Sequence, residues 1–124
     1  MWTQSPTDMF RKRVKRWPKK YKRELGAMMA NLQTVVMSLN QGAKVESLLF
    51  GFVHHEPGGV LALDQKGGGV GLKQTRLYVY PQKAQEVLHI ITIGDKGSQN
   101  DDIRDAKNFV DGVRAGKERD EDTQ

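Results

Sequence analysis

The stretch Lys73–Tyr80 places one cation and two aromatic rings on the same side of a predicted strand. Side chains alternate between the two faces of a strand, so one face carries Thr75, Leu77 and Val79 and the other carries Arg76, Tyr78 and Tyr80. A guanidinium offers a planar fork for phosphate, and tyrosine rings offer surfaces on which bases stack. The pattern predicts an open, RNA-binding sheet face. A strand arginine that lies over tyrosines only for solubility fits the residues equally well.

Lysines and histidines in the neighbouring turns are the other candidates for chemistry. Lys96 follows an apolar strand in the turn IGDKGSQ, from which it could stabilise charge on a phosphate at the sheet face. Lys66 and Lys73 are further turn lysines, and for all three the alternative is a solvated surface cation. His54 and His55 could act as general base or acid near neutral pH, or be bystanders in a loop. No third ligand stands at a recognisable spacing and the chain has no cysteine, so neither a metal site nor a cofactor is predicted.

The charge of the chain is unevenly distributed. The net charge is +5; nine of the 20 Lys and Arg residues lie within residues 11–23, and nine of the 15 Asp and Glu residues lie from Asp95 onward. This asymmetry predicts a polyanionic partner at the basic segment, with RNA-binding residues Lys19, Lys20, Lys22 and Arg23. The alternative is a basic arm that only keeps the protein soluble.

The elements that must position these residues are predicted in the order helix, three antiparallel strands, helix. Apolar residues recur at helical spacing from Pro18 to Leu39, and alternating or β-branched residues mark strands at 60–63, 73–80 and 87–93, with Pro81 ending the second. Residues 1–9 lack periodicity, residues 10–17 fit a short edge strand, and residues 43–50 fit either a helix or a strand. Asn100, Asp101 and Asp102 predict the capped start of a last helix that Gly116 closes.

The length of 124 residues predicts one domain without disulfides. We expect a basic N-terminal arm at residues 1–17, a folded domain at 18–116 and an acidic disordered tail at 117–124. No apolar run is long enough to span a bilayer, so the sequence predicts a soluble, cytoplasmic protein. It contains no Gly-x-Ser-x-Gly, phosphate-binding loop or zinc motif that would indicate a conventional hydrolase or nucleotide enzyme.

The segments RLYVY and IGDKGSQNDDIRDA, with the upstream helix PKKYKRELGAMMANLQTVVMSLNQG, resemble the RelE/ParE superfamily of bacterial toxins over roughly residues 18–114. The likeness is to the RelE and HigB-like branch and its phage-associated relatives. It implies an α+β, RelE-like fold in which one long N-terminal helix, or two, packs on a small antiparallel sheet of three or four strands, with a C-terminal helix. Arg76 matches the family's strand arginine and Lys96 its cation after the last strand. The family's second-strand lysines correspond to Leu61 and Leu63 and its C-terminal tyrosine has no counterpart, so Lys66, Lys73, His54 or His55 would substitute.

The resemblance also implies an activity and partners. The protein would be the toxin of a type II toxin–antitoxin system, a metal-independent endoribonuclease that cuts mRNA on translating ribosomes and inhibits translation. Its partners would be mRNA, the ribosome and a cognate antitoxin that covers the basic face in a heteromeric complex. Two other functions stay open: a ParE-like inhibitor of DNA gyrase, and a basic nucleic-acid-binding module without catalysis.

Overall fold

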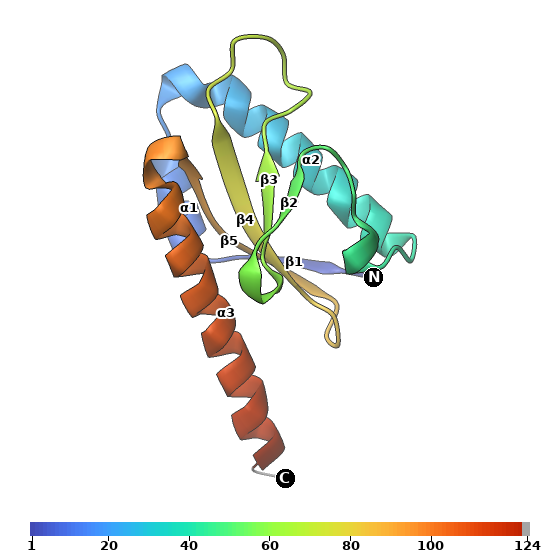
Figure 1. The fold of residues 1–124 in the computed structure, drawn as a ribbon. Coiled ribbons are helices and arrows are strands. Elements are labelled where there is room, and N and C mark those ends of the chain that lie inside the picture. The colour runs from blue at the N-terminus through green and yellow to red at the C-terminus, as the bar shows by residue number, and fades with distance from the viewer. Residues whose placement is uncertain (123–124) are drawn as a thin grey trace.

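A computed structural model describes residues 1–122 and shows a five-stranded mixed sheet with helices on both faces (Figure 1). The strand order is β1-β5-β4-β3-β2, with β1 parallel to β5 and the other neighbours antiparallel. The strands are β1 (Thr3–Pro6), β2 (Val53–His55), β3 (Leu61–Asp64), β4 (Thr75–Gln82) and β5 (Val87–Asp95). The helices are α1 (Asp8–Lys15), α2 (Lys22–Asn40) and α3 (Gln99–Asp122). The predicted α+β class is confirmed.

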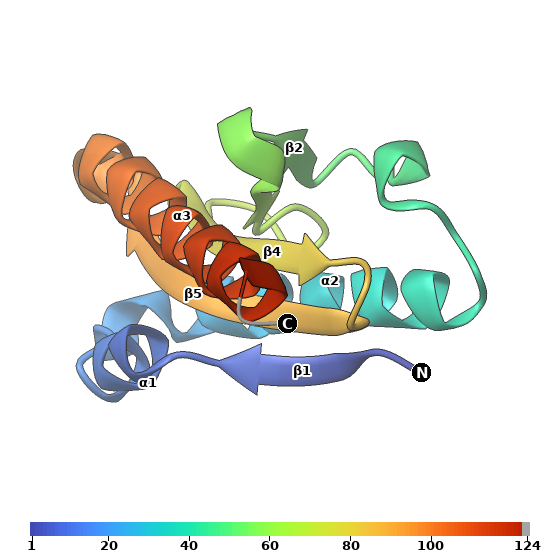
Figure 2. The same ribbon diagram turned by 90° about the horizontal axis from the view of Figure 1, so that it is seen from below.

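The two faces of the sheet bury two separate groups of apolar side chains. On one face Leu77 and Val79 of β4 pack with residues of α2, and on the other Tyr78 packs with Ala106 and Val110 of α3. Figures 1 and 2 show α2 and α3 on these opposite faces. The alternation predicted along β4 is therefore confirmed, and Arg76, Tyr78 and Tyr80 share the α3 face.

The first 17 residues differ from the prediction. Residues 3–6 form β1, which adds a parallel strand beside β5, so the sheet is larger than the predicted antiparallel sheet of three or four strands. The edge strand predicted at residues 10–17 is wrong, because most of this segment is α1. Phe10, Val14 and Trp17 lie at four- and three-residue spacing, which one helix face also satisfies, and they pack on the α2 side of the core. Thr7 caps α1 by accepting a hydrogen bond from the Phe10 amide.

The connecting segments follow the predicted hairpins with small differences. Residues 43–50 contain only a single 3₁₀ turn, η2 (Val45–Ser47), and the β2–β3 hairpin turns through η3 (Pro57–Gly59). The expected stop at Pro81 is wrong, since β4 continues to Gln82. The pairing of β4 with β3 ends at Val79, which lies opposite Leu61, the first residue of β3. Pro81 lies beyond this point, so on the β3 side no strand needs the N–H that proline lacks.

Asp102 ties α3 to α1 and to the end of β5. Its carboxylate is fully buried, forms an ion pair with Arg13 and accepts a hydrogen bond of 2.7 Å from the Ser98 hydroxyl. Arg13 also donates to the carbonyl of Ile93 at 3.2 Å. A Cβ atom at Gly94 would overlap the Asp102 carboxylate and the Ser98 hydroxyl, so only glycine lets this carboxylate approach the strand. Asp102 thus lies in the first turn of α3 as predicted, but it is more than a dipole residue.

The last helix is longer than predicted. Its start is preceded by the turn η4 (Lys96–Ser98), where Asp95 and Ser98 form a reciprocal capping box, so this cap precedes the predicted cap at Asn100. The helix passes Gly116, the predicted end, and reaches Asp122 within the predicted acidic tail; residues 123–124 lie outside the described chain. None of the helices within residues 1–122 has the length and apolar character needed to cross a bilayer.

We predict that Asp102→Asn lowers the free energy of unfolding by roughly 2–4 kcal/mol, because it removes the buried charge partner of Arg13 and leaves only the longer contact of 3.7 Å to Asp105. Urea denaturation followed by circular dichroism measures the change. Asp101→Asn is the matched control, since Asp101 is exposed in the same helical turn and should change stability by less than about 0.5 kcal/mol. Equal stability of the two variants would contradict the role assigned to Asp102.

Candidate functional site

Five polar side chains gather on the α3 face of the sheet, between α3 and the β2 edge. We call them the polar cluster: His54, Glu56, Asp64, Arg76 and Tyr78. The strand register places Asp64 opposite Arg76, and places Ala62 between His54 and Tyr78 in the next row. Glu56 lies one residue beyond β2, where its amide donates to the carbonyl of Val60 at 2.8 Å. The cluster therefore surrounds the small side chain of Ala62.

Arg76 is half-buried and only partly satisfied by hydrogen bonds. Its Nη1 lies 3.5 Å from Glu56 Oε1, and the two side chains are 17% and 18% exposed. The backbone of Arg76 lies opposite Asp64, but its side chain extends along the sheet to Glu56. It passes Ala62, whose small methyl group leaves room above the sheet. Its buried Nε has no hydrogen-bond partner among the described residues. A guanidinium has five N–H donors, so a contact of 3.5 Å leaves most of its capacity for an oxyanion.

Tyr78 is covered by α3, which corrects the prediction of an open face at this position. The residue is 1% exposed, and its hydroxyl, like the Thr92 hydroxyl on β5, is buried without a hydrogen-bond partner within residues 1–122. Burial first, and then the Asp102 and Glu56 carboxylates, raise the pKa of Tyr78 to about 12, with Arg76 opposing part of the shift. The hydroxyl therefore keeps its proton at neutral pH. Tyr78 cannot offer a ring for base stacking while α3 covers it, whereas Tyr80 is partly exposed.

His54 and Asp64 form a hydrogen-bonded pair beside Arg76. His54 Nε2 lies 2.8 Å from Asp64 Oδ2. Since an ionised carboxylate only accepts, Nε2 carries the hydrogen of this bond, and Nδ1 of the neutral ring can accept a proton. Lys66 Nζ lies 3.9 Å from the same Asp64 oxygen. His55 does not join this group: it follows the strand alternation to the other side, and its Nε2 bonds the carbonyl of Leu48 at 3.0 Å.

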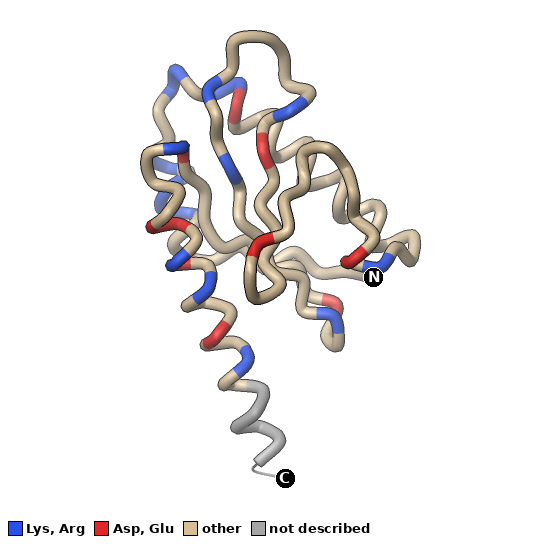
Figure 3. Tube along the Cα trace, viewed as in Figure 1, with Lys and Arg blue, Asp and Glu red and all other residues tan. Residues whose placement is uncertain are grey.

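Basic residues collect around the end of the sheet where β4 begins and β5 finishes, which we call the basic end (Figure 3). Of the nine Lys and Arg residues at positions 11–23, all are exposed except the half-exposed Arg13. The predicted RNA-binding residues Lys19, Lys20, Lys22 and Arg23 belong to η1 (Lys19–Tyr21) and the start of α2. Arg23 reaches the β3–β4 loop, where its Nη2 lies 3.5 Å from the carbonyl of Val70.

The three predicted turn lysines also lie at or near the basic end, outside the polar cluster. The amide of Lys73 is held by Glu24 Oε2 at 2.8 Å, and Lys66 Nζ donates to the carbonyl of Gly51 at 3.0 Å. Lys96 begins η4, two residues past Gly94, which pairs with Arg76. The structure thus places Arg76 and Lys96 at the same end of the sheet. All three lysines are exposed cations near that end of the polar cluster.

Sequence reasoning missed Glu56 and Asp64, the acidic partners of Arg76 and His54. Glu56 has a usable signal, because it stands two residues after His54 and therefore on the same side of a strand. Asp64 ends an apolar strand at a position opposite Arg76, which only the strand register reveals.

The cluster can bind an oxyanion at Arg76 and accept a proton at His54. Within residues 1–122 no group of three or more His, Asp and Glu side chains is arranged to hold a metal ion. Comparisons of the chain with protein-family models, with curated proteins and with solved structures found no match.

We predict that Tyr78→Phe leaves the free energy of unfolding unchanged or raises it by up to about 1 kcal/mol, because the buried hydroxyl has no partner in the described chain. Chemical denaturation measures this, with Tyr80→Phe on the same strand as the control. A loss of more than about 1 kcal/mol would show that the Tyr78 hydroxyl is a structural hydrogen-bonding group.

His89, beside Tyr80 on β5, gives a pH-dependent prediction. Its ring lies 5.3 Å from that of Phe109, and burial lowers its pKa from the ordinary value of 6.5. The folded state thus binds the proton less readily than the unfolded state, so stability should fall as pH drops from about 6.5 through the lower folded pKa. His89→Gln should flatten this part of the stability–pH curve, measured by thermal unfolding between pH 8 and pH 5.

Proposed function

We propose that the protein is a RelE-like toxin of the RelE/ParE superfamily, a metal-independent endoribonuclease that cuts mRNA in the cytoplasm. The observation that carries this proposal is Arg76, a half-buried guanidinium with an unsatisfied Nε and a stretched contact to Glu56. A buried arginine in this state favours a phosphate, whose oxygens accept two parallel N–H bonds. The neighbouring His54–Asp64 pair offers a base within the same cluster.

The cluster supports cleavage by the ribose 2′-hydroxyl. His54 Nδ1 takes the proton of the 2′-hydroxyl while Asp64 holds the ring through Nε2, and the 2′ oxygen bonds to phosphorus. Arg76 stabilises the extra negative charge on the phosphate. The bond from phosphorus to the 5′ oxygen breaks, and that oxygen takes a proton from solvent water, because the Tyr78 hydroxyl is buried under α3. The products are a 2′,3′-cyclic phosphate and a 5′-hydroxyl end.

The arrangement of cations supports the resemblance to RelE-like toxins. The family has an arginine within a strand and a cation just past the following strand, and here Arg76 pairs with Gly94 two residues before Lys96. The fold differs by the five-stranded sheet, in which the three-residue β2 forms one edge. This edge strand carries His54, so β2 supplies the proposed base where the family's second-strand lysines correspond to Leu61 and Leu63.

A second function, a nucleic-acid-binding module without catalysis, is favoured by one observation. Eight exposed Lys and Arg side chains on α1, η1 and the start of α2 form a cationic surface that requires no catalytic group. Deleting residues 1–17 would not test this surface cleanly, because β1 and Phe10 belong to the sheet and the core. Charge-removing substitutions at Lys19, Lys20, Lys22 and Arg23 are the better probe.

We predict that inducible expression in a bacterium arrests growth and that primer extension on abundant mRNAs shows discrete cuts in frame with the codons. Arg76→Ala should lower cleavage by roughly 10²–10³-fold, as removal of one oxyanion-stabilising donor does. His54→Ala should lower it as well. Arg104→Ala, which removes a 66%-exposed arginine from the outer side of α3, is the matched control and should cut like the wild type. Circular dichroism of each purified variant checks that it is folded.

The outcomes separate the candidate functions. Arrest without mRNA cuts would contradict the nuclease and indicate another target, such as gyrase. Absence of arrest, together with RNA binding that falls steeply with salt and is lost on the four substitutions at 19–23 but not on Arg76→Ala, would identify the module instead.

A further inference from the structure

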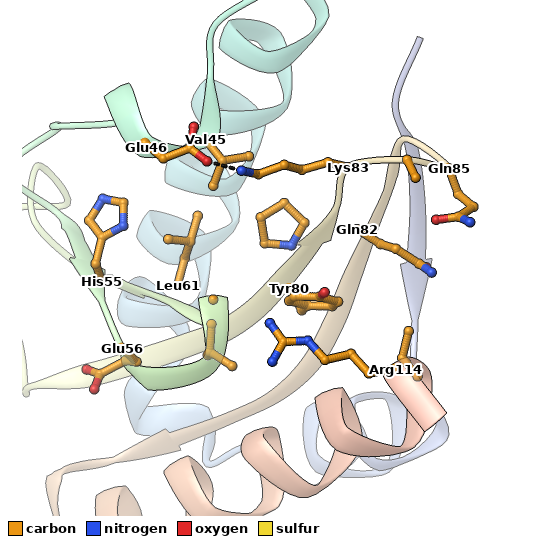
Figure 4. A pocket seen from close by; sticks show the side chains of 15 residues that line it. Val45, Glu46, His55, Glu56, Leu61, Tyr80, Gln82, Lys83, Gln85 and Arg114 are labelled. Carbon is orange, nitrogen blue, oxygen red and sulfur yellow. Dashed lines mark hydrogen bonds and ion pairs between the residues drawn. The ribbon is translucent and has the colours of Figure 1, made fainter. Parts of the chain in front are cut away.

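A pocket of about 520 Å³ lies at the opposite end of β4 from the basic end (Figure 4). Its walls come from η3 and the residue before it, from the β4–β5 hairpin and from α3; the contributing side chains include Glu56, Leu61, Tyr80, Lys83 and Arg114. Lys83 is paired with Glu46 across the pocket, as Figure 4 shows. The volume falls in the range of small-molecule sites.

The pocket is continuous with the polar cluster through Glu56. This residue both lines the pocket and lies 3.5 Å from the Arg76 guanidinium. The Glu56 amide donates a hydrogen bond to the carbonyl of Val60. Continuing the β3–β4 register by one residue from the Leu61–Val79 pair places Val60 opposite Tyr80. By contacting Glu56, Arg76 therefore reaches toward the row of the sheet that contains Tyr80. A phosphate held by Arg76 would therefore lie at the mouth of the pocket.

Tyr80 and Arg114 form one wall of the pocket, where the guanidinium lies over one face of the Tyr80 ring and a planar ring could extend the stack (Figure 4). The Arg114 guanidinium carbon lies 5.9 Å from the centre of the Tyr80 ring, and Arg114 Nη2 is held by the carbonyl of Gly58 at 3.0 Å. A Cβ at Gly59 would come within 3.4 Å of the ring, and its φ of +85° also favours glycine. Aromatic rings and guanidinium planes are the two protein surfaces on which single-stranded bases stack.

We propose that this pocket is a nucleobase subsite, which holds the base of one nucleotide flanking the phosphate bound by Arg76. The inference rests on the proposed function, because it assigns the pocket to the same RNA substrate. It makes Tyr80 and Arg114 specificity-determining residues rather than catalytic ones. The choice of base comes from this pocket, and the cut itself comes from the polar cluster.

Nucleoside 3′- and 5′-monophosphates of the four bases are the probes, titrated into the purified full chain and followed by backbone amide NMR. We expect shifts at Gly59, Tyr80 and the residues around Arg114. Tyr80→Leu should weaken binding by roughly 5- to 150-fold, the effect of losing one base–aromatic stack. Tyr80→Phe should bind like the wild type. Phe50→Leu, which removes another partly exposed ring outside the pocket, is the control and should bind unchanged. Inorganic phosphate should bind Tyr80→Leu and the wild type equally, because its site is Arg76.

Failure of this inference is distinguishable from failure of the nuclease. Arg76-dependent cleavage with nucleotide affinities and cut-site preferences unchanged in Tyr80→Leu would overturn the base subsite and leave the nuclease in place. Nucleotide binding that depends on the Tyr80 ring, in a protein that cuts no RNA, would retain the subsite and overturn the nuclease. Unfolding of Tyr80→Leu, checked by circular dichroism, would transfer the test to Arg114→Gln, which should weaken binding without disturbing the core because Arg114 is exposed.

Discussion

The structure depends most on one buried carboxylate. Asp102 of α3 is fully buried, and it is compensated by Arg13 of α1 and by the Ser98 hydroxyl of η4, just before α3. A buried charge is tolerated only with such partners, so the position of each partner element is constrained by the same group. Gly94 admits the carboxylate against β5. The direction in which α3 crosses the sheet, and hence what it covers, follows from this anchor.

The coverage by α3 gives the candidate site its physical character. The helix buries Tyr78 with Ile91, Ala106 and Val110, and leaves only a strip between itself and the β2 edge. In this strip Arg76 is removed from most of the water yet lacks a full set of hydrogen bonds. Electrostatic interactions are stronger in such surroundings, so a phosphate that completes these bonds gains more there than on an open surface. Unsatisfied donors lower the stability of the protein without a ligand, and such a loss is typical of sites where a ligand supplies the missing bonds.

Local pattern predicted much of the fold but not the environment of the site. The alternation of β4, the buried strand β5 and the long helix α2 are each encoded within about ten to twenty consecutive residues. The strand Thr3–Pro6 has no such pattern and forms by pairing with Val87–Ile90, far along the chain. The spacing of Phe10, Val14 and Trp17 fits a helix face, yet the basic residues between them obscured it. Whether Tyr78 is open or covered depends on a helix that begins about twenty residues later, so no periodicity within β4 could decide it.

The proposed RNA recognition would divide between two kinds of charge on the molecule. The cations of α1, η1 and α2 are exposed, so their attraction for RNA is long-ranged, sequence-independent and screened by salt. The groups along β4 are partly buried, and a partner must fit between α3 and η3 to reach them. One strand thereby orders the contacts: Arg76 begins at the basic end and reaches Glu56 beside the pocket, Tyr78 lies under the helix and Tyr80 lines the pocket. Under the proposed function, phosphate and base bind at different points of the same strand, so a change at Tyr80 would alter the choice of base while Arg76 still binds the phosphate.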